Sequence, residues 1–186
     1  GGATLVADRF GNPRSAYNFD GINDYISIPH SSRLAFKWSY SVSIWFKSCA
    51  VVPSSSESAL ISSGVGTISY KERGYNIGLR ESIPVGGGRL GFAPDFSAGS
   101  LGVTSGSDFA DGKWHHAVLV YAWDPANSTT QKYYFYVDGV RNQSDSTVNN
   151  FDSLTTSNGI WIGQAISRLG DYFTGAIDDI RLYDTA

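Results

Sequence analysis

The feature that most constrains the fold of this chain is a strict alternation of apolar and polar residues in short segments. It is clearest at residues 40–47, where Val42, Ile44 and Phe46 share one face of the alternation. Successive side chains of a β-strand point to opposite faces, so this segment is predicted to be a strand with one face in a core. About a dozen short strand-like segments follow one another between glycine-rich turns. They predict an all-β fold, a two-sheet antiparallel β-sandwich of the jelly-roll type.

The composition agrees with an all-β protein. Aromatic residues make up 14% of the chain and glycine contributes 21 residues, whereas charged residues make up only 17%. Amphipathic helices need leucine, glutamate, lysine and arginine at helical spacing, and no long segment shows that pattern. The 186 residues are enough to bury a single core without disulfides or metals. We therefore expect one domain covering residues 1–186.

Charge and hydropathy exclude several classes of partner. The net charge of −3 is unfavourable for binding a nucleic acid through its phosphates. No apolar run approaches the roughly 18 residues of a membrane span. The chain begins Gly-Gly without an initiator methionine or a signal peptide, so we interpret it as an excised module. Cys49 is the one cysteine, and the abundance of Ser, Thr, Asn and Gly over Lys and Glu is typical of a secreted, extracellular bacterial protein.

Two acidic stretches lie at opposite ends of the chain. Residues 18–29 begin with a turn that holds Asp20, Asn23 and Asp24 and continue as an alternating strand. Residues 175–184 hold a second carboxylate pair, Asp178 with its neighbour, and also continue as an alternating strand. We expect these two stretches to meet in space.

If they meet, their oxygens could form a metal site. Calcium takes six to eight oxygen ligands from carboxylates, amides, carbonyls and water. Asp20, Asn23, Asp24 and Asp178 are the predicted ligands of a structural calcium ion. Two alternatives stay open. In the first, Asp20 and Asn23 bind no metal and only cap their own turn. In the second, Asp179 points away from the site and pairs with Arg181, because adjacent strand residues face opposite sides.

The carboxylates elsewhere do not predict an enzyme. Retaining glycosidases need two carboxyl groups about 5–5.5 Å apart. The three glutamates, Glu57, Glu72 and Glu81, fall in loops or at strand ends, without a Glu-x-Asp-x-Glu run. His115 and His116 are adjacent, so in a strand they point to opposite faces and are expected to pack in the sheet. We expect a protein without catalytic activity.

Six motifs in order resemble a known family. They are Asn-Phe-Asp-Gly-Ile-Asn-Asp-Tyr-Ile-Ser-Ile-Pro at 18–29, Tyr-Ser-Val-Ser-Ile-Trp-Phe-Lys at 40–47, Asp-Gly-Lys-Trp-His-His-Ala-Val-Leu-Val at 111–120, Tyr-Val-Asp-Gly at 136–139, Ile-Trp-Ile-Gly at 160–163 and Phe-Thr-Gly-Ala-Ile-Asp-Asp-Ile-Arg-Leu-Tyr-Asp at 173–184. Together they resemble the laminin G-like domains of the concanavalin A-like lectin/glucanase superfamily.

This resemblance implies a concanavalin A-like jelly roll whose terminal strands lie side by side, often with a structural calcium near their junction. It also implies that Trp114 and the two histidines after it belong to the fold signature. Family members serve as carbohydrate-binding modules, adhesion domains or protein-binding modules, so the function must be argued from the site.

Sugar binding needs outward-facing aromatic rings beside polar side chains. Trp161 lies between Ile160 and Ile162, so it faces outward if those two residues face the core. Residues 75–80 and 89–93 are predicted to form a hairpin, and Arg80 and Arg89 should lie on its outward side. The full set of candidate ligand-binding residues, taken from this face and two neighbouring loops, is Asn76, Arg80, Arg89, Trp161, Arg73, Tyr75, Arg168 and Tyr172.

The sequence therefore predicts a non-catalytic carbohydrate-binding module for a polysaccharide or oligosaccharide. The arginines favour an anionic glycan, because guanidinium groups bind sulfate or carboxylate in bidentate fashion. We expect the module to be attached to a catalytic domain of a secreted bacterial polysaccharide-degrading enzyme. The alternative is an adhesion or protein-interaction module of a larger extracellular protein.

Overall fold

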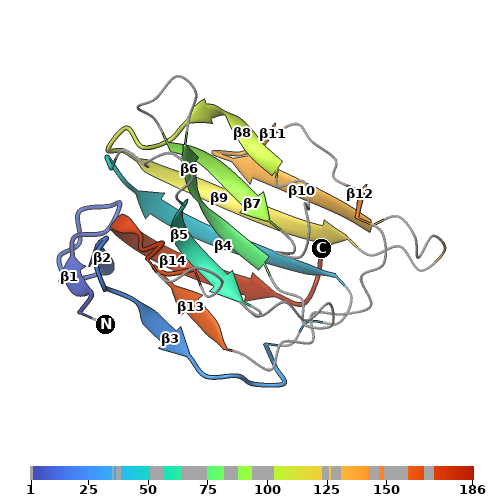
Figure 1. Ribbon diagram of the computed structural model, residues 1–186, viewed down its shortest axis with the longest axis horizontal. Helices are drawn as coiled ribbons and strands as arrows, with labels where there is room; N and C mark the ends of the chain where they lie inside the picture. The colour runs from blue at the N-terminus through green and yellow to red at the C-terminus, as the bar shows by residue number, and fades with distance from the viewer. Residues whose placement is uncertain are drawn as a thin grey trace.

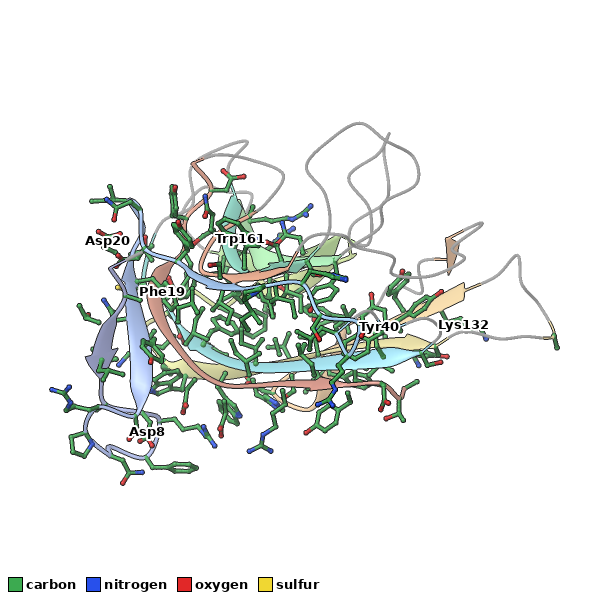
Figure 2. The ribbon with its side chains drawn as sticks, turned by 90° about the horizontal axis from the view of Figure 1, so that it is seen from below. Asp8, Phe19, Asp20, Tyr40, Lys132 and Trp161 are labelled. Atoms are coloured by element: carbon green, nitrogen blue, oxygen red, sulfur yellow. The ribbon has the colours of Figure 1, made fainter. Side chains whose placement is uncertain are left out.

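The computed structural model describes residues 2–34, 36, 39–50, 57–63, 75–81, 88–93, 103–122, 126, 131–142, 147–148, 159–165 and 170–186. The described residues form two antiparallel sheets and contain no helix. Figure 1 shows the sheets lying one over the other, and Figure 2 shows the same two layers from below. The predicted all-β, two-sheet antiparallel sandwich is confirmed. Because no helix is described, none is long and apolar enough to span a membrane.

Sheet A contains the first and last strands of the chain side by side. Its spatial order is β1 (Thr4–Val6), β2 (Ala16–Asp20), β14 (Thr174–Tyr183), β4 (Tyr40–Lys47), β9 (Trp114–Ala122), β10 (Gln131–Val137) and β11 (Val140–Asn142), with β12 (Thr147–Val148) paired to β10. Sheet B has the order β3 (Ile26–Ile28), β13 (Ile160–Ile162), β5 (Glu57–Ser63), β6 (Tyr75–Glu81), β7 (Gly88–Ala93) and β8 (Val103–Asp108).

The core lies between the two sheets and follows the predicted alternation. Val42, Ile44 and Phe46 of β4 are 0% exposed, while the residues between them are partly exposed. Figure 2 shows Phe19 and Tyr40 pointing into the space between the layers. Each strand of a sandwich buries alternate side chains against the facing sheet, so the remaining residues form the two outer faces.

The terminal stretches meet, as the sequence predicts. β2 pairs with β14 in antiparallel register, with Asn18 opposite Ala176 and Asp20 opposite Thr174. The pairing of β14 with β4 shifts between Asp178 and Arg181, and Asp179 has a φ of 45° within this irregularity. Such bulges bend a strand and redirect its side chains. At the edge of the sheet, Thr4–Val6 adds a strand beside β2.

Candidate functional site

The outer face of sheet B brings together the predicted residues that the structure describes on β6, β7 and β13. We call this surface the sheet B face. Trp161 is opposite Ser62, and Ser62 is opposite Asn76, so these three residues form one row across three strands. Arg80 is opposite Arg89 in the hairpin of β6 and β7. The register thus places the four main candidates on one face, as their alternation predicted.

Asn76 is the most unusual residue of this face. Its side chain is 0% exposed, and neither its amide oxygen nor its amide nitrogen has a hydrogen-bond partner in the structure. A buried polar group that lacks partners costs about 1–3 kcal/mol. Sequence alternation predicted that Asn76 lies on the side of the strand opposite Ile77, but it did not predict this burial.

Small residues next to Asn76 leave room for the Arg80 side chain. Gly78 is opposite Gly91 on β7 and opposite Ala59 on β5. A Cβ atom on Gly91 would lie 2.7 Å from Cδ and 2.8 Å from Nε of Arg80. Because Gly91 has no side chain, Arg80 can lie across its neighbouring strand.

An aromatic pair lies at the β13 end of the row. The rings of Trp161 and Tyr25 stack with their centroids 5.0 Å apart and their planes at 29°. Both side chains are partly exposed. Tyr25 was not among the predicted ligand-binding residues, although its alternation with Ser27, which is opposite Trp161, could have shown that it lies near this ring.

The strand register places acidic residues beside the two arginines that had favoured an anionic ligand. Arg80 is opposite Glu57, and Arg89 is opposite Asp108, so the two arginines stand between two acidic residues. The formal charge of this row of four strands is zero. The arginines alone indicated an anionic ligand. With the acidic residues included, the row does not favour an anionic ligand over a neutral one.

The structure describes two of the four other candidates, Tyr75 and Tyr172. The prediction that Tyr75 binds ligand is wrong. Its side chain is 1% exposed in the core and packs against Tyr40, with ring centroids 5.7 Å apart. Tyr75 alternates with Asn76, so it lies on the core side of the strand together with Ile77. Tyr172 is partly exposed and forms a β-bridge with Gln164, beyond the end of β13. Arg73 and Arg168 lie outside the described residues.

The acidic turn of residues 20–24 is satisfied by backbone groups. The backbone N–H groups of Ile22 and Asn23 donate to Oδ1 of Asp20 over 2.8 and 3.2 Å, and these bonds lower the pKa of Asp20. Asp24 is 6% exposed; its Oδ1 accepts from the N–H of Gly2 at 2.8 Å and its Oδ2 from the N–H of Asp20 at 3.1 Å. Asp20 therefore caps its turn, as the open alternative proposed.

The second carboxylate pair is held by an arginine. The guanidinium of Arg9 donates to Asp178 and to Asp179, each over 2.6 Å. It also lies 4.3 Å from the ring centre of Phe10 and 4.8 Å from that of Trp45. We call this arrangement the Arg9 clasp. Arg181 makes a longer contact of 3.6 Å with Asp179, so that predicted pairing is present but secondary.

The four predicted calcium ligands do not fit a single ion. Asp20 is opposite Thr174, and Asp178 lies four positions further along β14, which is about 13 Å at the rise of a strand. Asp178 already binds a cation, Arg9. Within the described ranges, no group of three or more His, Cys, Asp and Glu side chains could hold a metal ion. The structural calcium ion stays a prediction, and the positions of these residues do not favour it.

The adjacent histidines point to opposite faces, as expected. The ring nitrogens of His115 lie 2.8 Å from Oδ2 of Asp138 and 2.9 Å from Oδ1 of Asp111. His116 stacks on Trp45, with centroids 4.7 Å apart, and its Nε2 lies 2.8 Å from Oγ of Ser43. Burial lowers the pKa of His116, and so do the nearby arginines. These contacts join loops and strands of sheet A.

Comparisons with known proteins agree with this fold. A family model of laminin G type, described as the concanavalin A-like lectin/glucanases superfamily, matches residues 20–186. The chain therefore belongs to this superfamily. A search of curated proteins finds no match.

Among solved structures, domains LG4-5 of the mouse laminin alpha1 chain are similar with a TM-score of 0.69 and 18% identity, covering 98% of this chain and 45% of that one. The CBM40 of the Ruminococcus gnavus IT-sialidase, bound to alpha2,3 sialyllactose, has a TM-score of 0.54 and 16% identity, covering 87% and 90%. The NanB sialidase of Streptococcus pneumoniae has a TM-score of 0.61 and 19% identity, covering 92% and 26%. This chain thus spans less than half of the laminin structure, and identities this low establish the fold alone.

Proposed function

We propose that the chain is a non-catalytic carbohydrate-binding module that binds a polysaccharide on the sheet B face. The observation that carries this proposal is Asn76, a buried amide whose donor and acceptor are both unpaired. Keeping such a group in a sandwich is unfavourable for stability, so a role in binding is a physical reason for its presence. Sugar hydroxyls both donate and accept hydrogen bonds and can satisfy both ends of an amide.

The rest of the face has the composition of a sugar site. The stacked rings of Trp161 and Tyr25 provide a partly exposed aromatic surface for the apolar side of a pyranose. Arg80 and Arg89 add guanidinium donors for hydroxyl groups. Because Asn76 is 0% exposed, contact with it requires neighbouring groups to move, and the rings at the end of the row are the first point of contact.

The structural neighbours support the wider context of this proposal. One is itself a sialidase module with bound sialyllactose, and another sialidase chain contains a region of this fold within about a quarter of its length. We propose by analogy that this module is part of a secreted polysaccharide-degrading enzyme. Its ligand can be neutral, because acidic residues flank the two arginines.

The deciding experiment replaces Asn76 with leucine, which has a similar size and no polar group. We expect Asn76→Leu to abolish retention on a panel of immobilised polysaccharides in affinity gels, while the free energy of unfolding is unchanged or higher. Arg80→Ala should weaken retention, whereas Arg181→Ala, an exposed arginine of sheet A, should not.

A clear loss of stability in Asn76→Leu with unchanged retention would assign the amide to the fold and overturn the proposal. Including sialyllactose, uronic and sulfated glycans beside neutral ones tests the charge argument. Exclusive binding of the anionic ligands would restore the original expectation from the arginines.

A further inference from the structure

A concave site lies on the opposite side of the molecule from the sheet B face, where β4 ends and β9 begins. It is a pocket of about 510 Å³ whose lining includes Asn18, Asp20, Lys47, Cys49, Trp114 and Thr174. Volumes of roughly 300–1,000 Å³ are usual for small-molecule sites, so it can hold one or two sugar rings. No residue of the sheet B face contributes to it.

The register of sheet A aligns the central residues of this pocket. Asn18 is opposite Ala176, Ala176 is opposite Lys47, and Lys47 is opposite Trp114. These four residues therefore form a straight row across β2, β14, β4 and β9, which spans about 14 Å at the usual strand spacing. Ala176 is small and 8% exposed, so it forms the bottom of the pocket. The amide of Asn18 lies on one side of it, and Lys47 and Trp114 lie on the other.

The polar groups of the row are available for a ligand. Among the described residues, the side chains of Asn18, Lys47 and Trp114 have no hydrogen-bond or ion-pair partner. At the rim, the exposed side chain of Asp20 adds a carboxylate. The pocket thus offers an amide, an ammonium and a carboxylate beside an indole ring.

We infer that this pocket is a second saccharide site, specific for a neutral pyranose or disaccharide. The indole of Trp114 provides a surface for the apolar side of a sugar ring. Asn18, Lys47 and Asp20 provide donors and acceptors for its hydroxyls. Lys47 and Asp20 carry opposite charges, so the pocket has no net charge to attract an anion. The class of ligand rests on the proposed function, but the location of the site does not.

This second site would make the module bivalent. The pocket belongs to the outer face of sheet A, whereas Trp161 and Asn76 lie on the outer face of sheet B. Two sites on opposite faces cannot hold adjacent sugars of one short oligosaccharide. They can bind two polysaccharide chains, and the combined binding to an insoluble substrate would exceed that of either site alone.

Cys49 provides a reporter that is specific for this pocket. It is the one cysteine of the chain, it is exposed, and it lines the pocket. The experiment measures the rate at which iodoacetamide alkylates Cys49, without sugar and with lactose, maltose or cellobiose. At a sugar concentration ten times its dissociation constant, a ligand that covers the thiol slows alkylation about tenfold.

We expect at least one of the three disaccharides to slow alkylation. Lys47→Ala and Asn18→Ala should reduce this protection, and Trp114→Ala should abolish it, with thermal unfolding used to confirm that each variant is folded. Lys132→Ala is the matched control, because Lys132 is an exposed lysine at the far end of the same sheet (Figure 2).

The second site is overturned if no disaccharide protects Cys49, or if protection survives in folded Trp114→Ala protein. The same assay on Asn76→Leu separates the two sites. Protection that persists in this variant supports an independent pocket, even if no polysaccharide is retained by the sheet B face. Protection that is lost in it contradicts an independent pocket.

Discussion

The two carboxylate pairs of the β2–β14 strand pair are alike in sequence and different in structure. Asp20 and Asp24, the turn carboxylates, accept hydrogen bonds from backbone N–H groups. Asp178 and Asp179, the strand carboxylates, bind the guanidinium of Arg9. The turn carboxylates are thus stabilised by neutral backbone N–H groups, those of nearby residues and that of Gly2. The strand carboxylates are stabilised by the positive charge of Arg9, which is 169 residues from Asp178 in the sequence.

The difference shows that acidic residues at a strand end can be stabilised in more than one way. A carboxylate cluster needs compensating donors or charge, but backbone amides and arginine can supply them as well as calcium. Backbone N–H groups take this role for Asp20 and Asp24, and Arg9 takes it for Asp178 and Asp179. The two kinds of partner should respond differently to substitution, salt and pH.

The largest effect is expected for Asp24→Ala. Asp24 is 6% exposed, and its removal leaves the N–H groups of Gly2 and Asp20 without their acceptor. We expect the free energy of unfolding, measured by urea denaturation, to fall by about 1–3 kcal/mol. Asp24→Asn keeps one acceptor oxygen and should lose less. Equal losses in the two variants would mean that the negative charge, and not the acceptor geometry, is what matters.

A smaller loss is expected for Arg9→Ala. The variant removes the Arg9 clasp, which leaves Asp178 without a counter-charge and leaves Asp179 with its longer contact to Arg181. The thermal midpoint should fall by several degrees, and the fluorescence of Trp45 should change because the guanidinium no longer lies over its ring. Arg33→Ala, an exposed arginine outside both regions, is the control.

Salt separates the two pairs further. Because the Arg9 clasp is an ion pair near the surface, the difference between wild type and Arg9→Ala should shrink at 1 M NaCl. The loss caused by Asp24→Ala should not. If both losses respond equally to salt, the proposed distinction between charged and neutral partners is wrong.

A pH dependence is expected from the turn carboxylates. Backbone hydrogen bonds from Ile22 and Asn23 lower the pKa of Asp20 below its ordinary value. A lowered pKa in the folded state stabilises the protein above the unfolded pKa, near 3.9, and this contribution is lost as the pH falls through the folded pKa. Thermal midpoints between pH 6 and pH 2 should therefore fall less steeply for Asp20→Asn than for wild type. Parallel curves would show that Asp20 does not contribute.

The smallest effect is expected for calcium. Asp178 lies far along β14 from Thr174, the residue opposite Asp20, and the carboxylates of Asp20, Asp24 and Asp178 already have partners. EDTA followed by excess calcium should therefore leave the thermal midpoint unchanged. A site saturated at a hundred times its dissociation constant would stabilise the fold by about 2.7 kcal/mol, which is easily measured. Such a shift, lost in Asp20→Asn, would place a calcium ion at the turn.

Much of the fold was predictable because alternation is a local property. The pattern at residues 40–47 predicted which side chains of β4 enter the core, and the same reasoning located the faces of Asn76 and Trp161. Tyr75 was wrongly taken as a binding residue of the neighbouring loop, although its alternation with Asn76 indicated a core position. The meeting of the terminal stretches was also predicted, from their matching acidic turns and the resemblance to the laminin G-like family.

The partners of these residues were not predictable, because they depend on register and on long-range contacts. No local pattern shows that Arg9 reaches Asp178, that Glu57 and Asp108 stand beside the two arginines, or that Asn18 and Trp114 share a row. These relations are decided by strand order, which places residues far apart in sequence on neighbouring strands. The sequence by itself determined the strands and their faces. The tertiary structure decided which charges are neutralised, which amide is buried and where a ligand has room to bind.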